Sequence, residues 1–73
     1  MKYYYSVETE FLHDNKTYGI KIYADGNLVE YISDVCCEER AIRELCDRLT
    51  EEALDPEQIY DVLDDLLSEL YDL

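Results

Sequence analysis

The C-terminal third of this chain contains no cation. From Leu49 to Leu73 there is no lysine, arginine or histidine, although this stretch holds nine of the 19 acidic residues. A solvated helix usually mixes charges of both signs, because opposite charges three or four residues apart stabilise it. A purely acidic face loses that stabilisation and adds self-repulsion. Either a basic partner compensates for this cost, or the acids only provide solubility.

Other residue types are scarce, and each shortage excludes a class of site. The chain has two glycines and one histidine, so it has neither a glycine-rich phosphate loop nor an EF-hand calcium loop. His13 is the single candidate for a histidine base, and the sequence places no serine or cysteine beside it. We therefore expect no enzymatic activity and no cofactor.

The three cysteines do not form a recognisable motif. Cys36 and Cys37 are adjacent and Cys46 follows nine residues later, which is neither a zinc-site spacing nor a disulfide framework. Cys46 falls on an apolar helical stripe, where a small buried residue is the ordinary explanation. No signal peptide or membrane-spanning apolar run is recognisable. We expect reduced thiols and a cytoplasmic protein.

The size and charge of the chain limit its partners. Its 73 residues are expected to form one domain, residues 1–73, near the size at which a core just outweighs chain entropy. The formal charge of −13 repels nucleic acids and anionic membranes and attracts basic protein surfaces. Because 48% of the residues are hydrophobic and regularly spaced, we expect a folded chain.

Alternating apolar residues predict three strands in the first half of the chain. The period-two pattern covers about residues 2–12 and 17–24, and a third strand covers about 27–32. Asp25-Gly26, between the last two, is typical of a tight hairpin turn because both central residues of such a turn need a positive φ. The sequence therefore predicts an antiparallel meander.

The two turns predict the register of the sheet. A turn at Asp25-Gly26 pairs Ile22 with Val29, and an equivalent turn at Asp14-Asn15 pairs Val7 with Ile22. Apolar residues then oppose apolar residues in both hairpins. The predicted core face of the sheet consists of Tyr3, Tyr5, Val7, Phe11, Tyr18, Ile20, Ile22, Val29 and Tyr31.

Helical spacing dominates the second half. Residues 37–52 carry one apolar stripe and residues 56–72 a wider one. Asp55-Pro56 is a typical helix start, since Asp caps the first turn and Pro is favoured at the first helical position. The sequence thus predicts an α+β fold: a three-stranded antiparallel meander, order 1-2-3, with two C-terminal helices packed on one face.

The second helix places its acids opposite its apolar stripe. An ordered row of carboxylates imitates phosphate spacing at a lower entropy cost than a disordered acidic tail. We therefore expect a non-enzymatic interaction protein that docks on a basic surface, such as that of a nuclease or another nucleic-acid-binding protein, and inhibits it. The acidic face predicted to bind consists of Glu57, Asp61, Asp64, Asp65 and Asp72.

Two alternatives come from other features. The outer face of the sheet carries Tyr4, Tyr23 and Leu28, with Leu12 and Ile32 toward the other end, and exposed aromatic groups favour an interface. On this reading the chain is a small cytosolic domain that forms a homodimer or binds a partner through the sheet. Spacing would also let Asp61, Asp64, Asp65 and Glu69 hold Ca²⁺ or Mg²⁺, but we favour a solvated or partner-facing surface and no metal.

Several short stretches resemble a known group of proteins. Tyr18-Gly19-Ile20, Ile32-Ser33-Asp34-Val35, Leu54-Asp55-Pro56, Asp61-Val62 and Asp65-Leu66-Leu67 are similar to short, acidic, uncharacterised proteins of Firmicutes and related gut bacteria. The resemblance implies a bacterial cytosolic origin and no known activity. In type, the chain also resembles small acidic DNA mimics and anti-CRISPR inhibitors, an analogy of size and charge without a shared motif.

Overall fold

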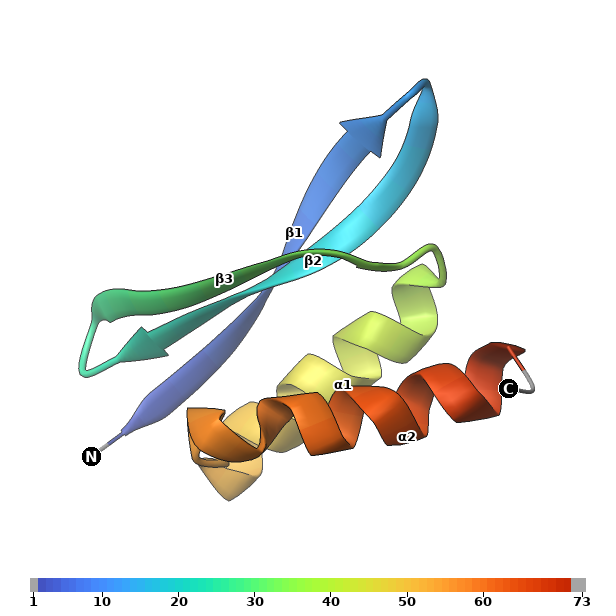
Figure 1. The fold of residues 1–73 in the computed structure, drawn as a ribbon. Helices are drawn as coiled ribbons and strands as arrows, with labels where there is room; N and C mark the ends of the chain where they lie inside the picture. Colours follow the sequence, from blue (N-terminus) through green and yellow to red (C-terminus); the bar gives the residue numbers. More distant parts are fainter. Residues whose placement is uncertain (1, 72–73) are drawn as a thin grey trace.

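The computed structural model describes residues 2–71, which form a three-stranded sheet followed by helices (Figure 1). The strands are antiparallel and lie in the order β1-β2-β3. The elements are β1 (Tyr3–Leu12), β2 (Asn15–Ala24), β3 (Asn27–Cys36), α1 (Glu39–Glu52), the 3-10 helix η1 (Pro56–Gln58) and α2 (Ile59–Tyr71).

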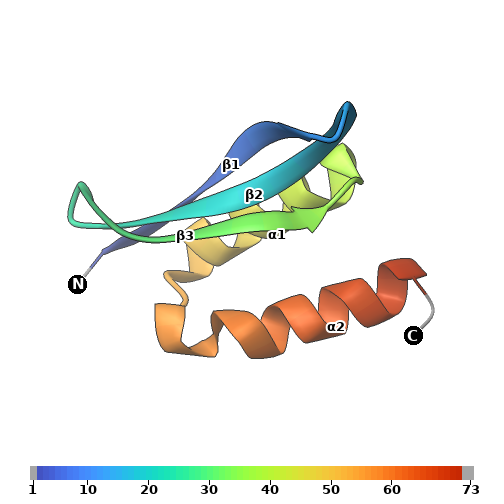
Figure 2. The same cartoon turned by 45° about the horizontal axis from the view of Figure 1, so that its top comes forward.

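The molecule has two layers, with both helices on the same face of the sheet (Figure 2). Helix α1 contacts β1 and β2. Helix α2 is tied to β3, since the Tyr60 hydroxyl donates to Glu30 Oε1 at 3.0 Å. The predicted α+β fold, with its 1-2-3 meander and two helices, is confirmed.

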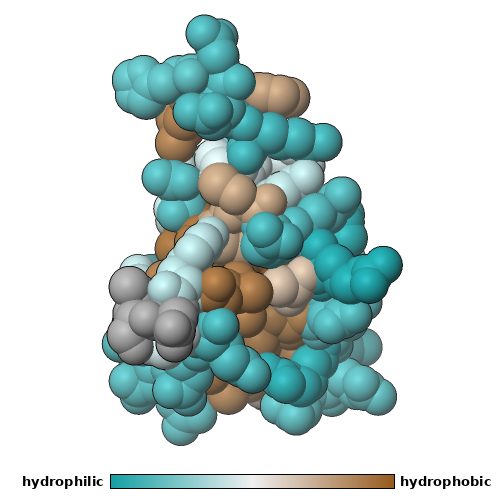
Figure 3. All heavy atoms as spheres, turned by 90° about the vertical axis from the view of Figure 1, so that its right-hand side faces the viewer, coloured by the Kyte–Doolittle hydropathy of each residue, from teal (hydrophilic) through white to brown (hydrophobic). Residues whose placement is uncertain are grey.

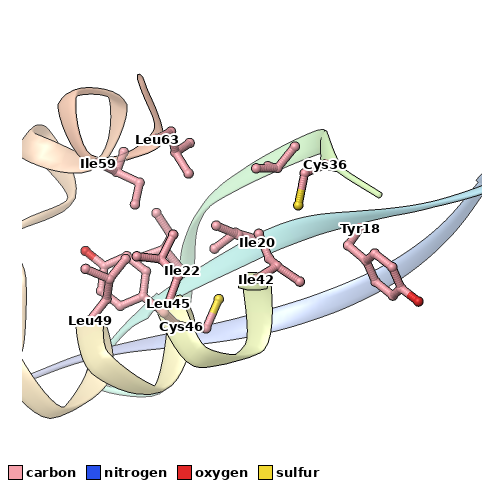
Figure 4. Close-up of a cluster of buried hydrophobic side chains, with 12 residues drawn as sticks. Tyr18, Ile20, Ile22, Cys36, Ile42, Leu45, Cys46, Leu49, Ile59 and Leu63 are labelled. Atoms are coloured by element: carbon pink, nitrogen blue, oxygen red, sulfur yellow. The ribbon is translucent and has the colours of Figure 1, made fainter. Parts of the chain in front are cut away.

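The core lies between the sheet and the helices (Figure 4). The central strand β2 contributes Ile20 and Ile22, both fully buried, because it is covered by strands on both sides and by helices below. Helix α1 adds four buried residues, whereas α2 adds only Ile59 and Leu63. Partly buried around this core are Tyr3, Val7, Ile32, Leu54, Val62, Leu66, Leu67 and Leu70.

The first hairpin turns one residue earlier than the sequence predicted. His13 and Asp14 both have positive φ, 51° and 66°, and Leu12 pairs with Asn15. Val7 consequently opposes Ile20 rather than Ile22. Each residue of β1 thus opposes a residue of β2 two positions away from the predicted one. A register shift of two preserves the faces of both strands.

The second hairpin begins as predicted but departs from the predicted register after two pairs. Ala24 opposes Asn27 and Tyr23 opposes Leu28, but Ile22 then opposes Glu30, so Val29 is an extra residue. Such a bulge reverses the faces of the residues that follow it. Val29 is 54% exposed and Tyr31 is 45% exposed. Placing these two residues in the core was therefore wrong.

The same bulge brings Ile32 to the other side of the sheet. It opposes Ile20 and packs against the core, so its predicted place on the outer face was also wrong. Strand β3 continues to Cys36, four residues beyond the expected end near Ile32. Its final residues, Val35 and Cys36, are buried.

Phe11 was also wrongly placed in the core, for a different reason. It lies at the end of β1 and is 73% exposed. The β1-β2 hairpin projects past both helices, so no helix covers this end of its inner face (Figure 1). Alternation identifies the face that a residue occupies, but the length of the covering layer decides whether that residue is buried.

Glu10 lies on β1, the edge strand opposite β3, and holds the second half of β3 in place. Glu10 accepts hydrogen bonds from the Tyr31 hydroxyl, from Ser33 Oγ at 3.0 Å and from the Asp34 N–H at 2.9 Å. Its carboxylate reaches β3 across Gly19 of β2, where a Cβ atom would lie 2.9 Å from Glu10 Oε1. The same Cβ atom would lie 2.6 Å from the Ile32 carbonyl oxygen, so the backbone of β3 leaves room only for a glycine at position 19.

The helix ends show one expected and one unexpected cap. Asp55 accepts a hydrogen bond from the Glu57 N–H at 3.0 Å, the N-cap that the sequence predicted. Helix α1 begins after Glu38, which makes no side-chain cap. The α1 helix ends at Ala53 in the left-handed region, with φ 52°, and its N–H bonds back to the last turn.

Candidate binding faces

The first candidate face is the solvent side of η1 and α2. Four of the five residues of the predicted acidic face are exposed there, and Asp72 lies outside the described residues. The helical spacing of Asp61, Asp64 and Asp65 places them on adjoining turns of α2. The four described members are Glu57, Asp61, Asp64 and Asp65. Glu69, exposed one turn beyond Asp65, continues the row.

These acids have no cation within their own helix. The ion pairs found among residues 2–71 join Lys21 to Glu8 at 3.4 Å and Arg43 to Glu39 at 3.0 Å. Neither pair involves η1 or α2. Within residues 2–71 no lysine or arginine is therefore ion-paired with this face, which leaves its negative charge available to a basic surface.

Between the helices lies a hollow of about 340 Å³ with a mixed lining. Half-buried leucines of α2 form part of it, and hydrophobic residues remain visible among hydrophilic ones at this end of the molecule (Figure 3). Arg48 of α1 is the cation in the lining of this hollow. The lining consists of Ala41, Glu44, Leu45, Arg48, Leu66, Glu69 and Leu70.

The second candidate face is the outer side of the sheet. Tyr4 and Leu28 are 54% and 52% exposed, and Tyr23 between them is half-buried. The rings of Tyr4 and Tyr23 lie 6.1 Å apart at a tilt of 47°. The structure thus brings the three residues of the predicted sheet site together on neighbouring strands.

A charged cluster borders this aromatic patch. Lys21 lies 5.6 Å from the ring centre of Tyr31 and pairs with Glu8 at 3.4 Å. The hydrogen bond from Tyr31, and then that from the Asp34 N–H, lower the pKa of Glu10. The same bond raises the pKa of Tyr31 to about 12. The pairing of Glu8 with Lys21 follows from the predicted sheet, whereas the contact of Glu10 with Tyr31 was missed because it depends on the bulge after Tyr23.

The thiols differ in accessibility. Burial raises the pKa of Cys46 to about 12 and also raises the pKa of Cys36. A thiol whose pKa is raised is a poor nucleophile at neutral pH, because the reactive form is the thiolate. Cys37 is exposed, and its N–H donates to the Tyr71 hydroxyl at 3.3 Å.

Two further kinds of site are absent from residues 2–71. No three side chains of the His, Cys, Asp and Glu types come together there in a way that would hold a metal ion. Among the described helices, none is long and apolar enough to span a membrane.

Comparison with known families supports one part of the resemblance. Residues 1–69 match the model of a family of unknown function, DUF6514. The chain belongs to this family. No curated protein and no solved structure matches it. Membership in DUF6514 brings no activity, ligand or partner with it, so the function must be argued from the two faces.

Proposed function

We propose that this DUF6514 member is a non-enzymatic interaction protein that docks its acidic η1-α2 face on a basic surface of a nucleic-acid-binding protein and inhibits it. The contact residues are Glu57, Asp61, Asp64 and Asp65, with Asp72 beyond the described residues. A CRISPR nuclease or another nuclease has a basic groove of the required kind. The inhibitor then occupies the place of the nucleic acid.

The observation that carries this proposal is an exposed, ordered and unmixed row of acids. Each described member of the row is exposed, and no lysine or arginine occurs anywhere from Leu49 to the end of the chain. A helix holds these carboxylates in fixed relative positions, so little conformational entropy is lost on binding. Long-range attraction also accelerates association and makes it sensitive to salt.

The test compares two variants with the same change of charge. In the first, Asp61, Asp64 and Asp65 are changed to Asn; in the second, Glu44, Glu51 and Glu52 of α1 are changed to Gln. All six positions are exposed. Each purified protein is added to a panel of nucleases, CRISPR nucleases included, and DNA cleavage is measured between 50 mM and 500 mM salt.

We expect the unaltered chain and the α1 variant to inhibit at least one nuclease at low salt. The α2 variant should lose that inhibition, and high salt should weaken it in all cases. If the two variants inhibit equally, overall charge rather than the α2 face is responsible and the proposal fails. Inhibition that is indifferent to salt would contradict it as well.

A second candidate function rests on the outer face of the sheet. Tyr4 and Leu28 are exposed beside Tyr23, an arrangement that favours an interface with a second copy or another protein. On this reading the acids only provide solubility. Sedimentation or light scattering tests it: a monomer that is independent of concentration argues against the homodimer, and a dimer abolished by Leu28→Ser supports it.

A further inference from the structure

The outer edge of β1 presents backbone groups that β2 does not use. In an antiparallel pair, alternate residues bond to the neighbouring strand and the others point away from it. Tyr5 belongs to the outward set, because its N–H donates to Thr50 Oγ1 at 2.8 Å and its carbonyl accepts from the same hydroxyl at 3.3 Å. Steps of two along the strand add Val7, Thr9 and Phe11 to this set.

Helix α1 covers this edge at Tyr5 but not at residues 7–11. Thr50 satisfies Tyr5, whereas within residues 2–71 no side chain bonds to the outward backbone groups of Val7, Thr9 or Phe11. The opposite edge of the sheet is interrupted, since β3 has two register shifts and a left-handed residue, Asp34, with φ 53°. Such irregularities prevent strand addition. Residues 7–11 of β1 therefore form the regular open edge of the described sheet.

A hollow continues this edge toward α1. It has a volume of about 180 Å³ and lies between β1 and the exposed side of the helix. A side chain of an added strand would enter it, while the 73% exposed Phe11 offers an apolar contact at the other end. The hollow is lined by Tyr4, Tyr5, Ser6, Val7, Arg43, Cys46 and Asp47.

The charges beside this edge determine which kind of segment can pair with β1. Glu8 of β1 pairs with Lys21, whereas Glu10 accepts only from neutral donors of β3 and so keeps an uncompensated charge. Asp47 borders the hollow, and the cation there, Arg43, is already paired with Glu39. A second copy fits poorly, because antiparallel β1-β1 pairing centred on Thr9 sets Glu8 opposite Glu10 of the other copy, and opposed like charges destabilise a sheet. An extended segment rich in lysine or arginine complements the edge in both backbone and charge.

We propose that residues 7–11 of β1 bind an extended basic segment of a partner protein as a fourth strand. Main-chain hydrogen bonds to Val7, Thr9 and Phe11 supply the pairing, and a lysine or arginine on the outer face lies beside the uncompensated charge of Glu10. This site is separate from the acidic face of α2 and does not depend on it.

The probe is the synthetic peptide Thr-Lys-Val-Lys-Val-Lys-Thr, whose lysines and valines alternate. Its control has the same charge but carries proline in place of both valines, which removes two N–H donors. Amide hydrogen exchange is followed by NMR at low salt. We expect the probe to slow exchange at Val7, Thr9 and Phe11 by about tenfold or more, and the control to leave these amides unchanged.

A protein variant tests the same contacts from the other side. Thr9→Pro removes an outward N–H that β2 does not use, so the sheet is expected to survive and affinity for the probe to fall about tenfold. Circular dichroism checks folding. If the variant does not fold, a probe with N-methylated valines replaces it and must likewise bind more weakly.

Three outcomes would overturn the proposal. They are equal binding of the probe and its proline control, binding without protection of Val7, Thr9 and Phe11, and self-association of the free chain through β1. The variant with Asp61, Asp64 and Asp65 changed to Asn should retain the protection of β1. Its failure to do so would assign peptide binding to α2, so the two proposals are distinguished.

Discussion

The two helices cover the same face of the sheet, but they differ in burial and in charge. Four residues of α1 are at most 4% exposed, whereas only Ile59 and Leu63 of α2 are buried. Helix α1 contains three arginines among its acids and an internal Glu39–Arg43 ion pair, whereas α2 has acids alone. The buried residues of α1 are Ile42, Leu45, Cys46 and Leu49.

This difference separates support of the fold from recognition. Helix α1 has the burial and charge balance of an element that holds the sheet. Helix α2 is half-covered, with Leu66, Leu67 and Leu70 only partly buried, and its acids lack internal compensation. Segments with few buried contacts open at lower free energy than the core, and a bound partner stabilises them. Helix α2 therefore gains most from a partner.

The largest expected effect comes from one leucine in each helix. Leu49→Ala in α1 should lower the free energy of unfolding by about 3 kcal/mol, because a fully buried side chain leaves a cavity. Leu66→Ala in α2 should cost about 1 kcal/mol, because its site is already half-open. Urea unfolding followed by circular dichroism measures both. Equal losses would contradict the contrast between the helices.

The next effect is an alkaline loss of stability centred on α1. Burial raises the pKa of Cys46 from about 9 to about 12, so the folded state holds this proton more tightly than the unfolded chain does. Stability is fully present below pH 9 and falls as the pH rises toward 12, by about 3 kcal/mol at pH 11. Unfolding under reducing conditions from pH 8 to 11 measures it.

The control for this effect is the variant Cys46→Ala. The two proteins are compared by how steeply the free energy of unfolding falls with pH, not by its absolute value. The variant should lose less stability between pH 9 and 10, before the buried Tyr5 hydroxyl, whose pKa is raised to about 12, begins to contribute. Identical slopes in the two proteins would show that the thiol is not the titrating group.

Local patterns in the sequence predicted the fold class and the acidic face. The α2 acids follow from helical spacing alone, since a helix that buries one stripe must expose the other. The bulge in β3 could not be predicted this way. The strand beyond the bulge is held by Glu10, 21 residues from Tyr31 in sequence, whose carboxylate passes over Gly19. Val29, Tyr31 and Ile32 were misplaced because the bulge shifts their register.

The predicted 1-2-3 order already makes β1 an edge strand, but which part of that edge is open could not be predicted from the sequence. The coverage of Tyr5 by Thr50 joins residues 45 positions apart, and it marks where α1 stops covering the strand. Neither hydrophobic alternation nor helical spacing predicts where the helical layer stops covering the sheet. The exposure of Phe11 has the same origin.

A smaller effect is expected at Gly19, and it should act on the α2 side. A Cβ atom in Gly19→Ala would lie 2.6 Å from the Ile32 carbonyl oxygen, so β3 must move. We expect a loss of about 1 to 2 kcal/mol. Because α2 is tied to β3 through Tyr60 and Glu30, NMR shift changes should extend into α2 more than into α1. Changes confined to α1 would contradict this.

The smallest effects should have opposite signs in the two helices. Changing Asp64 and Asp65 to Asn and Glu69 to Gln removes repulsion among acids that also approach the negative end of α2, so stability should rise by about 0.5 kcal/mol at low salt. Glu39→Gln in α1 breaks an ion pair and should lower stability by about 0.3 kcal/mol. Thermal unfolding at 10 mM and 500 mM salt measures both, and both differences should shrink at high salt.

A helix that becomes more stable without its acids keeps them for a purpose other than folding. A loss of stability in α2 would instead make the acids structural and remove the main support for a binding face.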